Sequence, residues 1–293
     1  APLVADAIRG RFDVCAMSEV FDSVEQEAVA AGLPGYRTAA GPGQQGLRRT
    51  GSGLLTAVDE SVADMTASVP YAYRTGGDLR DSDTYATKGA LLVRVRVAPD
   101  LPEVDVVSTH LFAGGELLPI PGSDDRTRHH QARLRQLGEL VAFIESHRSP
   151  TNPLVVLGDF NVSAHDPDPR LNDPTSRYRD LVDHLEPLGL RDVWADHGIG
   201  PGATCSFTDR SDLPSDPDDA DQVVDDPEAS PATSAGERID YLWVASPTDG
   251  STSVHVDRPR RWAFTGRGVQ GGPAGSLSDH LALSTTLHLR RVD

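Results

Sequence analysis

Leu154-Val155-Val156-Leu157-Gly158-Asp159-Phe160-Asn161-Val162 is the stretch of sequence that decides the fold. Its four leading apolar residues are typical of a strand buried on both faces, and Gly158 loosens the backbone where the polar side chains begin. Asp159 and Asn161 are two residues apart, so in extended backbone they project to the same side. An isolated Gly-Asp-x-Asn favours a helix N-cap or an Asx-turn, so the interpretation depends on the rest of the chain.

Composition restricts the classes of protein to consider. The 293 residues suffice for one large α/β domain or two small ones, and no apolar run approaches the roughly eighteen residues that cross a bilayer. The formal net charge is −17, and a surface this acidic repels phosphate backbones and anionic membranes at low salt. Such a surface is also typical of a halophilic protein, because the concentrated salt around it screens the repulsion between its acidic surface and other anions. We prefer this interpretation, so acidity counts only weakly against nucleic acid.

Two residue types carry further information. Cys15 and Cys205 show neither metal-type spacing nor a disulfide framework, and we interpret both as small core residues. Lys88 is the only lysine among many arginines, which indicates a position that needs a compact ammonium. The alternative is that this lysine has been retained by chance.

No signal peptide is visible, but the chain starts at Ala1 without a methionine, so removal of a leader is an open alternative. We favour a cytoplasmic over a secreted protein, and a monomer.

The order of elements predicts an α/β fold. Helices are expected over 4–9, 23–31, 126–146 and 178–188, and strands over 12–17, 53–58, 90–97, 104–109, 238–244 and 281–289. Many strands with few interspersed helices predict two sheets packed face to face with helices outside, in one domain over residues 1–293. Asp, Ser, Pro and Ala dominate residues 209–236, which predicts a mobile acidic loop.

Polar residues recur at the predicted strand ends. Glu19 follows one core strand, His110 ends another, and Asp279 with His280 precedes the last. Each has a simpler explanation when taken alone, since Glu19 could cap a helix, His110 could be a core histidine and Asp279 a turn residue. Because neighbouring strand residues point to opposite faces, Asp279 and His280 can converge only in the loop before the strand.

Asp240 makes the simpler explanations harder to sustain. It lies inside the apolar run 239–243, where an unpaired carboxylate is costly, so it needs a partner, and a histidine is the natural one. Polar groups at several strand ends are hard to explain by packing alone. The candidate site comprises Glu19, His110, Asp159, Asn161, Asp240, Asp279 and His280. Acids and amides without cysteine ligands suit a hard cation such as Mg²⁺.

Five short motifs occur in order along the chain: Ser18-Glu19-Val20-Phe21-Asp22, Ser108-Thr109-His110-Leu111, Gly158-Asp159-Phe160-Asn161, Arg238-Ile239-Asp240-Tyr241 and Ser278-Asp279-His280. In this order they resemble the motifs of the endonuclease/exonuclease/phosphatase (DNase I-like) superfamily over nearly the whole chain. The resemblance implies a four-layered α/β sandwich and metal-dependent cleavage of a phosphoester. The superfamily's opening strand, with an asparagine near the metal, is missing here, which we interpret as truncation or loss.

The resemblance implies a role for each carboxylate and amide of the site. Glu19 would be the ligand of Mg²⁺, or of Mn²⁺ or Ca²⁺, and Asp279 would lie close to the metal. Asp159 and Asn161 would orient or deprotonate the attacking water and hold a phosphate oxygen. With the metal bound, charge that builds on the phosphoryl oxygens would be offset.

The resemblance leaves the roles of the two histidines open. His280, held by Asp240, would be the general base or a stabiliser of the phosphorane. His110 would hydrogen-bond a phosphoryl oxygen or assist the leaving group. Which histidine moves the proton does not follow from sequence, because it depends on geometry and on pKa values.

Two motifs and one pair of residues narrow the substrate class. Glu-Val-Phe-Asp and Thr-His-Leu are most similar to the neutral sphingomyelinase branch, which also has an Asp and a Lys-Gly five residues apart, matching Asp83 and Lys88-Gly89. This implies an ammonium near the substrate phosphate, held or switched by Asp83, whereas the alternative is a lysine that opens an edge strand. We therefore expect a sphingomyelinase C-like phosphodiesterase that acts on a phospholipid head group or a related phosphodiester.

Two alternatives remain. A DNase I-like endonuclease or exonuclease would use the same catalytic residues with a basic, aromatic-lined groove. That groove could come from Arg48 and Arg49, the arginines of 126–135, and Arg258, Arg260 and Arg261 with Trp262. The second alternative is a binding module that kept the fold and lost catalysis.

Overall fold

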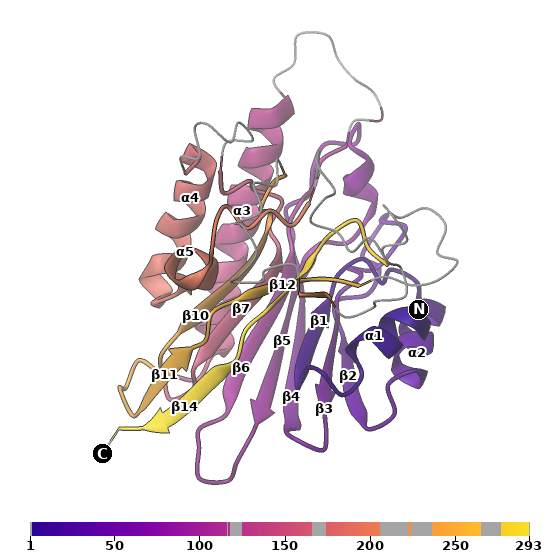
Figure 1. Cartoon of the computed structure of the whole chain (residues 1–293). Helices are drawn as coiled ribbons and strands as arrows, with labels where there is room; N and C mark the ends of the chain where they lie inside the picture. Colours follow the sequence, from indigo (N-terminus) through magenta and orange to yellow (C-terminus); the bar gives the residue numbers. More distant parts are fainter. Residues whose placement is uncertain are drawn as a thin grey trace.

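The computed structural model of the protein describes residues 2–115, 117, 125–165, 174–205, 222–223, 236–264 and 277–292. Two layers of β-strands pack face to face, and helices cover the outer face of each (Figure 1). The α/β sandwich predicted from the sequence is therefore confirmed. No described helix is both long enough and apolar enough to cross a bilayer.

The larger sheet has six strands and carries the fold-deciding stretch. Their order is β4 (Asp64–Ala72), β5 (Gly89–Arg96), β6 (Val104–His110), β7 (Leu154–Asp159), β10 (Asp240–Ala245) and β8 (Arg191–Asp192). β6 and β7 are parallel, whereas the other neighbours are antiparallel. The middle strands are buried on both faces, as their near-continuous apolar sequence predicts.

The opposing layer consists of three smaller groups of strands. They are β1 (Val14–Met17), β3 (Leu55–Asp59) and β2 (Tyr36–Ala40); β11 (Thr252–Val256) and β14 (Leu287–Arg291); and β13 (Ala282–Ser284), β12 (Arg260–Ala263) and β9 (Gln222–Val223). The single strand expected over 281–289 is thus divided into β13 and β14. Within the acidic segment 209–236, β9 and residue 236 are described, and the remainder of that segment lies outside the described residues.

Helices close the sandwich on both sides. α3 (Asp125–His147) and α4 (Ser176–Leu185) cover the six-stranded sheet, and α1 (Pro2–Ile8) and α2 (Ser23–Ala31) cover the three-stranded group of β1, β3 and β2 (Figure 1). The short helices are η1 (Ser82–Tyr85), η2 (Glu186–Leu188) and α5 (Val193–His197).

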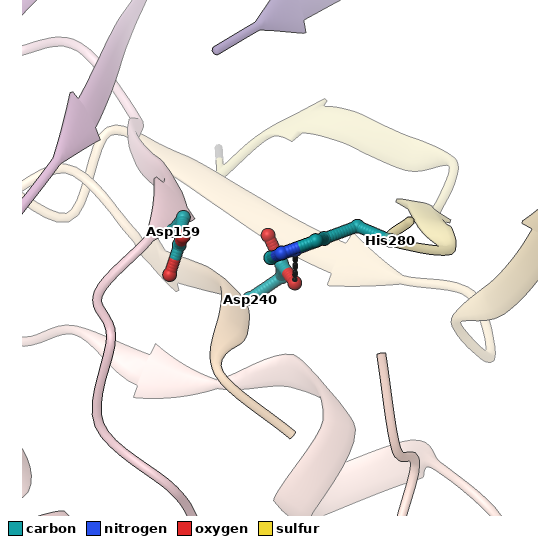
Figure 2. Close-up of side chains that lie close together, drawn as sticks. All are labelled: Asp159, Asp240 and His280. Atoms are coloured by element: carbon teal, nitrogen blue, oxygen red, sulfur yellow. Dashed lines mark hydrogen bonds and ion pairs between the residues drawn. The ribbon is translucent and has the colours of Figure 1, made fainter. Parts of the chain in front are cut away.

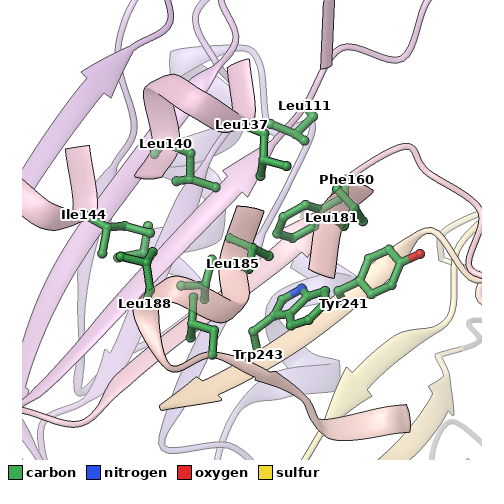
Figure 3. Close-up of a cluster of buried hydrophobic side chains, with 14 of the residues drawn as sticks. Leu111, Leu137, Leu140, Ile144, Phe160, Leu181, Leu185, Leu188, Tyr241 and Trp243 are labelled. Carbon is green, nitrogen blue, oxygen red and sulfur yellow. The ribbon is translucent and has the colours of Figure 1, made fainter. Parts of the chain in front are cut away.

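The main hydrophobic core lies between the six-stranded sheet and the two helices α3 and α4. Leucines of both helices meet the aromatic side chains of β10 there, as Figure 3 shows for Leu137, Leu181, Leu185, Tyr241 and Trp243. Each fully buried side chain of this size contributes about 1.5–3 kcal/mol to the stability of the folded state. This core fixes the positions of β6, β7 and β10, whose ends carry the predicted site residues.

A groove of about 1020 Å³ separates β1 from the C-terminal strands. β1 pairs with β3, β13 with β12 and β14 with β11, and the structure describes no second partner for any of the three. Apolar side chains of the six-stranded sheet, such as Val106, Val155 and Leu242, form part of the lining. The groove extends as far as Gly158 and Asp240, so it opens beside the predicted site.

Candidate active site

Sheet register places three predicted site residues side by side. His110 at the end of β6 is opposite Asp159 at the end of β7, and Asp240 at the start of β10 is opposite Asp159 on its other side. Side chains of residues that are directly opposed in a sheet lie on the same face about 5 Å apart. Gly158 permits the close approach of β7 to β6, since a Cβ added there would lie 1.9 Å from the backbone oxygen of Thr109.

Asp159, Asp240 and His280 form a compact cluster (Figure 2). One ligand atom from each lies within 4.8 Å of the others, and Nδ1 of His280 is 2.8 Å from Oδ2 of Asp240. Burial and the neighbouring charge of Asp240 raise the pKa of Asp159 to about 7. Burial alone would lower the pKa of His280, but hydrogen bonds with Asp240 and Cys205 outweigh it and raise that pKa. At neutral pH His280 is therefore a cation beside two carboxyl groups.

His110 differs from His280 in its charge. Its side chain is buried, with Nε2 3.6 Å from Oδ2 of Asp159 and 4.0 Å from Oε1 of Glu19. Nζ of Lys88 lies 3.0 Å from the same His110 nitrogen and 3.0 Å from Oδ1 of Asp83. Burial, and then the charge of Lys88, lowers the pKa of His110 well below its usual value. His110 is therefore a neutral imidazole with an ammonium against its ring.

Two site residues have unusual backbone conformations. Among the described residues, Glu19 (φ 63°) and Asn161 (φ 52°) are the non-glycine residues with positive φ. Such conformations cost about 1–2 kcal/mol, although asparagine tolerates them better than most residues, and they cluster at functional sites. Gly53 packs against Glu19, since a Cβ on Gly53 would lie 2.9 Å from the Cα of Glu19.

Asn161 meets Asp159 through an Asx-turn and not through extended backbone. β7 ends at Asp159, so the two side chains do not converge through extended backbone. Instead the Asn161 backbone N–H donates to Oδ1 of Asp159 (2.7 Å), which is the Asx-turn considered above as an alternative. Nδ2 of Asn161 donates to Oδ2 of Asp159 and to the Leu111 carbonyl, both at 3.1 Å.

The donor set fits a hard divalent cation. The Glu19 side chain is 63% exposed with its carboxylate beside His110, and Asp279 is exposed next to His280, outside the Asp159–Asp240–His280 cluster. Burial and the neighbouring Asp240 make ionisation of Asp159 unfavourable, and a cation that prefers oxygen ligands would offset both. The residues present are therefore compatible with Mg²⁺.

Sequence reasoning missed two residues that position the cluster. Cys205, interpreted as a core residue, has a side chain that hydrogen-bonds to His280, whereas Cys15 is half-buried and packs near α1 and α2. The Thr204 hydroxyl accepts a hydrogen bond from the Asp240 backbone N–H at 3.3 Å. Nothing in the apolar run around residue 240 indicates these partners, because they come from a separate segment.

Arg133, one of the arginines expected to line a basic groove, instead fixes the segment that follows β6. It is buried on α3 and donates hydrogen bonds to the carbonyl oxygens of Phe112 and Ala113, both at 2.7 Å, just beyond β6. Gln136 donates on the same helix face to the Thr75 carbonyl, and its Oε1 accepts from the Phe112 N–H. The signal was available, since both residues continue the buried stripe of Leu137 at helical spacing.

The sequence matches the Endonuclease/Exonuclease/phosphatase family over residues 2–280. The chain belongs to this family of phosphoester hydrolases, which confirms the resemblance inferred from the five motifs. A comparison with curated protein sequences gives no match.

Several solved structures have a similar fold. A beta toxin variant from Staphylococcus aureus with bound magnesium ions has a TM-score of 0.58 and 13% identity, over 97% of this chain and 90% of that one. A mannosyl-6-phosphatase from Bacteroides thetaiotaomicron gives 0.57 and 15%, over 98% and 90%. D. rerio TDP2 complexed with single-strand DNA product gives 0.57 and 15%, over 94% and 86%. At these identities the likeness shows the fold alone.

Proposed function

We propose that this protein is a Mg²⁺-dependent phosphodiester hydrolase of the sphingomyelinase C type, acting on a phospholipid head group or a related phosphodiester. The observation that carries the proposal is the contact of Lys88, the only lysine, with both Asp83 and His110. Asp83 and Lys88-Gly89 have the spacing that resembles the neutral sphingomyelinase branch. A buried ammonium at the edge of the Asp159–Asp240–His280 cluster supports a substrate phosphate bound beside His110.

Glu19 and Asp279 would hold Mg²⁺ next to this cluster. When bound, the ion supplies Lewis-acid stabilisation of negative charge on the phosphoryl oxygens. The magnesium ions bound in the similar beta toxin structure support the choice of Mg²⁺ as the ion.

Asp159 and Asn161 are placed to activate the water. The raised pKa of Asp159, about 7, suits it to take a proton from water at neutral pH. Nδ2 of Asn161 is engaged by the Leu111 carbonyl and by Asp159, which leaves Oδ1 to accept a hydrogen bond from the attacking water. The water oxygen then attacks phosphorus while Asp159 receives the proton.

The two histidines have different parts in this scheme. His280 is kept protonated by Asp240, so it stabilises negative charge on the phosphorane and can give its proton to the departing alkoxide. His110 stays neutral, and its ring together with the Lys88 ammonium offers hydrogen-bond donors to a phosphoryl oxygen.

A DNase I-like nuclease is the second candidate, and the likeness to TDP2 with a DNA product favours it. Three of the nine arginines expected to line a basic groove are engaged in bonds within the protein. Arg128 bonds to Asp81 and Asp125, Arg133 donates to two carbonyl oxygens, and Arg261 is buried against the Ala203 carbonyl. These commitments favour the lipid substrate over nucleic acid.

Hydrolysis of bis-p-nitrophenyl phosphate with added Mg²⁺ tests the catalytic assignment. Asp159→Ala and His280→Ala are each expected to lower kcat by about 10²–10⁴-fold, since each removes a group that moves a proton or holds charge in the transition state. Asp183→Ala and His197→Ala, which change exposed residues of the same types, serve as matched controls. Wild-type rates in the Asp159 or His280 variant, with unchanged circular dichroism, would remove this mechanism.

Parallel assays on plasmid DNA and on phosphocholine lipids, at low and at molar salt, separate the candidate functions. Release of phosphocholine with intact plasmid supports the lipid substrate, and nicking of the plasmid alone supports the nuclease. No Mg²⁺-dependent hydrolysis of any of the three substrates would support a binding module that has lost catalysis.

A further inference from the structure

Three exposed leucines stand on loops that flank the candidate site. Leu47 is 99% exposed, Leu79 74% and Leu117 55%. These are large apolar side chains in contact with water, although single exposed hydrophobic residues are common on protein surfaces. Their shared surroundings, rather than their exposure alone, make them informative.

Backbone hydrogen bonds join the three loops into one surface. The N–H of Arg49, two residues after Leu47, donates to the Tyr85 carbonyl at 2.6 Å. The Tyr85 hydroxyl donates to the Leu79 carbonyl at 3.0 Å, and the Leu117 N–H donates to the Arg80 carbonyl at 2.8 Å. We define Leu47, Leu79 and Leu117 as the leucine rim.

The leucine rim is connected directly to the candidate site. η1 (Ser82–Tyr85) lies between two of its loops and carries Asp83, whose Oδ1 is 3.0 Å from Nζ of Lys88. The other oxygen of Asp83 accepts a hydrogen bond from the Ala113 N–H at 2.6 Å, and Lys88 contacts His110. A surface bound to the rim would therefore lie against the loop that holds Asp83 beside Lys88.

The loops of the rim (46–49, 74–85 and 113–117) contain as many arginines as acidic residues, unlike the strongly acidic chain as a whole. Arg49 and Arg74 are exposed and Arg48 and Arg80 are half-buried on these loops, with Asp78 paired to Arg80. The whole chain has a net charge of −17. A zwitterionic bilayer offers phosphates to these guanidinium groups and has no net charge to repel the rest of the protein, whereas an anionic bilayer would repel it.

We propose that the leucine rim inserts into the surface of a zwitterionic phospholipid bilayer, so that the site containing Lys88 and His110 faces the head-group phosphates. The inference rests on the proposed function and deepens it, because it names the physical form in which the substrate is met. The leucines provide apolar insertion, and the flanking arginines contact the lipid phosphates.

Sedimentation with phosphatidylcholine vesicles tests the proposal. Each of Leu47→Ser, Leu79→Ser and Leu117→Ser is expected to weaken partitioning about five-fold, and the triple variant about a hundred-fold. A control triple variant, Leu3→Ser, Val24→Ser and Val62→Ser, changes other exposed apolar residues and is expected to bind as the wild type does. Binding that persists in molar salt is expected, since apolar insertion is not screened.

The outcomes separate this inference from the proposed function. The rim variant is expected to hydrolyse soluble bis-p-nitrophenyl phosphate at the wild-type rate and to lose hydrolysis of vesicle lipid. Vesicle binding without any phosphodiester hydrolysis would overturn the function and leave the rim supported. The insertion of the leucine rim would be contradicted if the rim variant and the wild type bound phosphatidylcholine vesicles equally, or if neither bound. It would also be contradicted if the protein bound phosphatidylglycerol vesicles or single-stranded DNA in place of phosphatidylcholine.

Discussion

Glu19 and Asn161 both adopt the left-handed backbone conformation, and both are candidates for contact with the metal or the substrate phosphate. In Asn161 this conformation accompanies the Asx-turn in which both its backbone N–H and its side-chain Nδ2 donate to Asp159. The strained backbone therefore goes with a defined position of the amide relative to the carboxylate.

Substitution of Asn161 can separate the backbone contribution from the side-chain contribution. Asn161→Ala and Asn161→Gly both remove the amide, so both are expected to lower kcat on bis-p-nitrophenyl phosphate by at least about ten-fold. Only alanine is strained at φ 52°, so the glycine variant should be more stable than the alanine variant by about 1 kcal/mol. Urea denaturation measures this difference, and an alanine variant as stable as the glycine variant would contradict the argument.

At the scale of elements, a buried carboxylate ties the η1 loop to α3. Asp81 is fully buried, Arg128 bonds to both of its oxygens, and Nε2 of His129 lies 3.1 Å from Oδ1. Burial alone would raise the pKa of Asp81, but hydrogen bonds from Arg128 and His129 outweigh it and lower that pKa. The loop that holds Asp83 is therefore fixed by an ionised residue.

This linkage predicts a pH dependence of stability. Because the pKa of Asp81 is lower in the folded than in the unfolded state, its contribution is fully present above the unfolded value, about 3.9, and is lost as pH falls through the folded value. Asp81→Asn should lower the free energy of unfolding at neutral pH by about 2 kcal/mol. In urea denaturation, the difference in free energy of unfolding between wild type and variant should become smaller below about pH 4. A difference that stays constant with pH would contradict this linkage.

Sequence periodicity identified some elements and not others, for physical reasons. α2 begins and ends where the pattern predicts, because Asp22 caps it and Gly32 ends it. β4 (Asp64–Ala72) was not anticipated, since an edge strand with one exposed face and a proline has no apolar run. Residues 281–289 are apolar enough to suggest one strand, but the chain leaves β13 after Ser284 and pairs again from Leu287.

At the scale of the whole molecule, the net charge of −17 sets how the fold responds to salt. Self-repulsion among acidic side chains destabilises the compact state at low ionic strength, and salt screens it. We expect the Tm to rise by several degrees between low and molar KCl. Differential scanning calorimetry measures this shift, and a Tm that falls with added salt would contradict a salt-adapted surface.

The candidate site shows how far sequence reasoning extends across a whole chain. Residue types and their order were enough to nominate His110, Asp159 and Asp240, because chemistry restricts which groups can cleave a phosphoester. Their contact depends on the register of β6, β7 and β10, which no local pattern encodes. Cys205 reaches His280 through tertiary packing alone, whereas the burial of Arg133 follows from the helical spacing of α3 and only its partners had to come from the structure.

The burial of Lys88 has a practical consequence. With one lysine in the chain, almost fully buried between Asp83 and His110, an amine-reactive reagent has a single side-chain target, and that target lies beside the candidate site. The rate of covalent labelling at this position would report how often the Lys88 side chain becomes exposed to solvent. A bound phosphate ester should shield it, so mass spectrometry of the labelled protein could follow occupancy without any turnover.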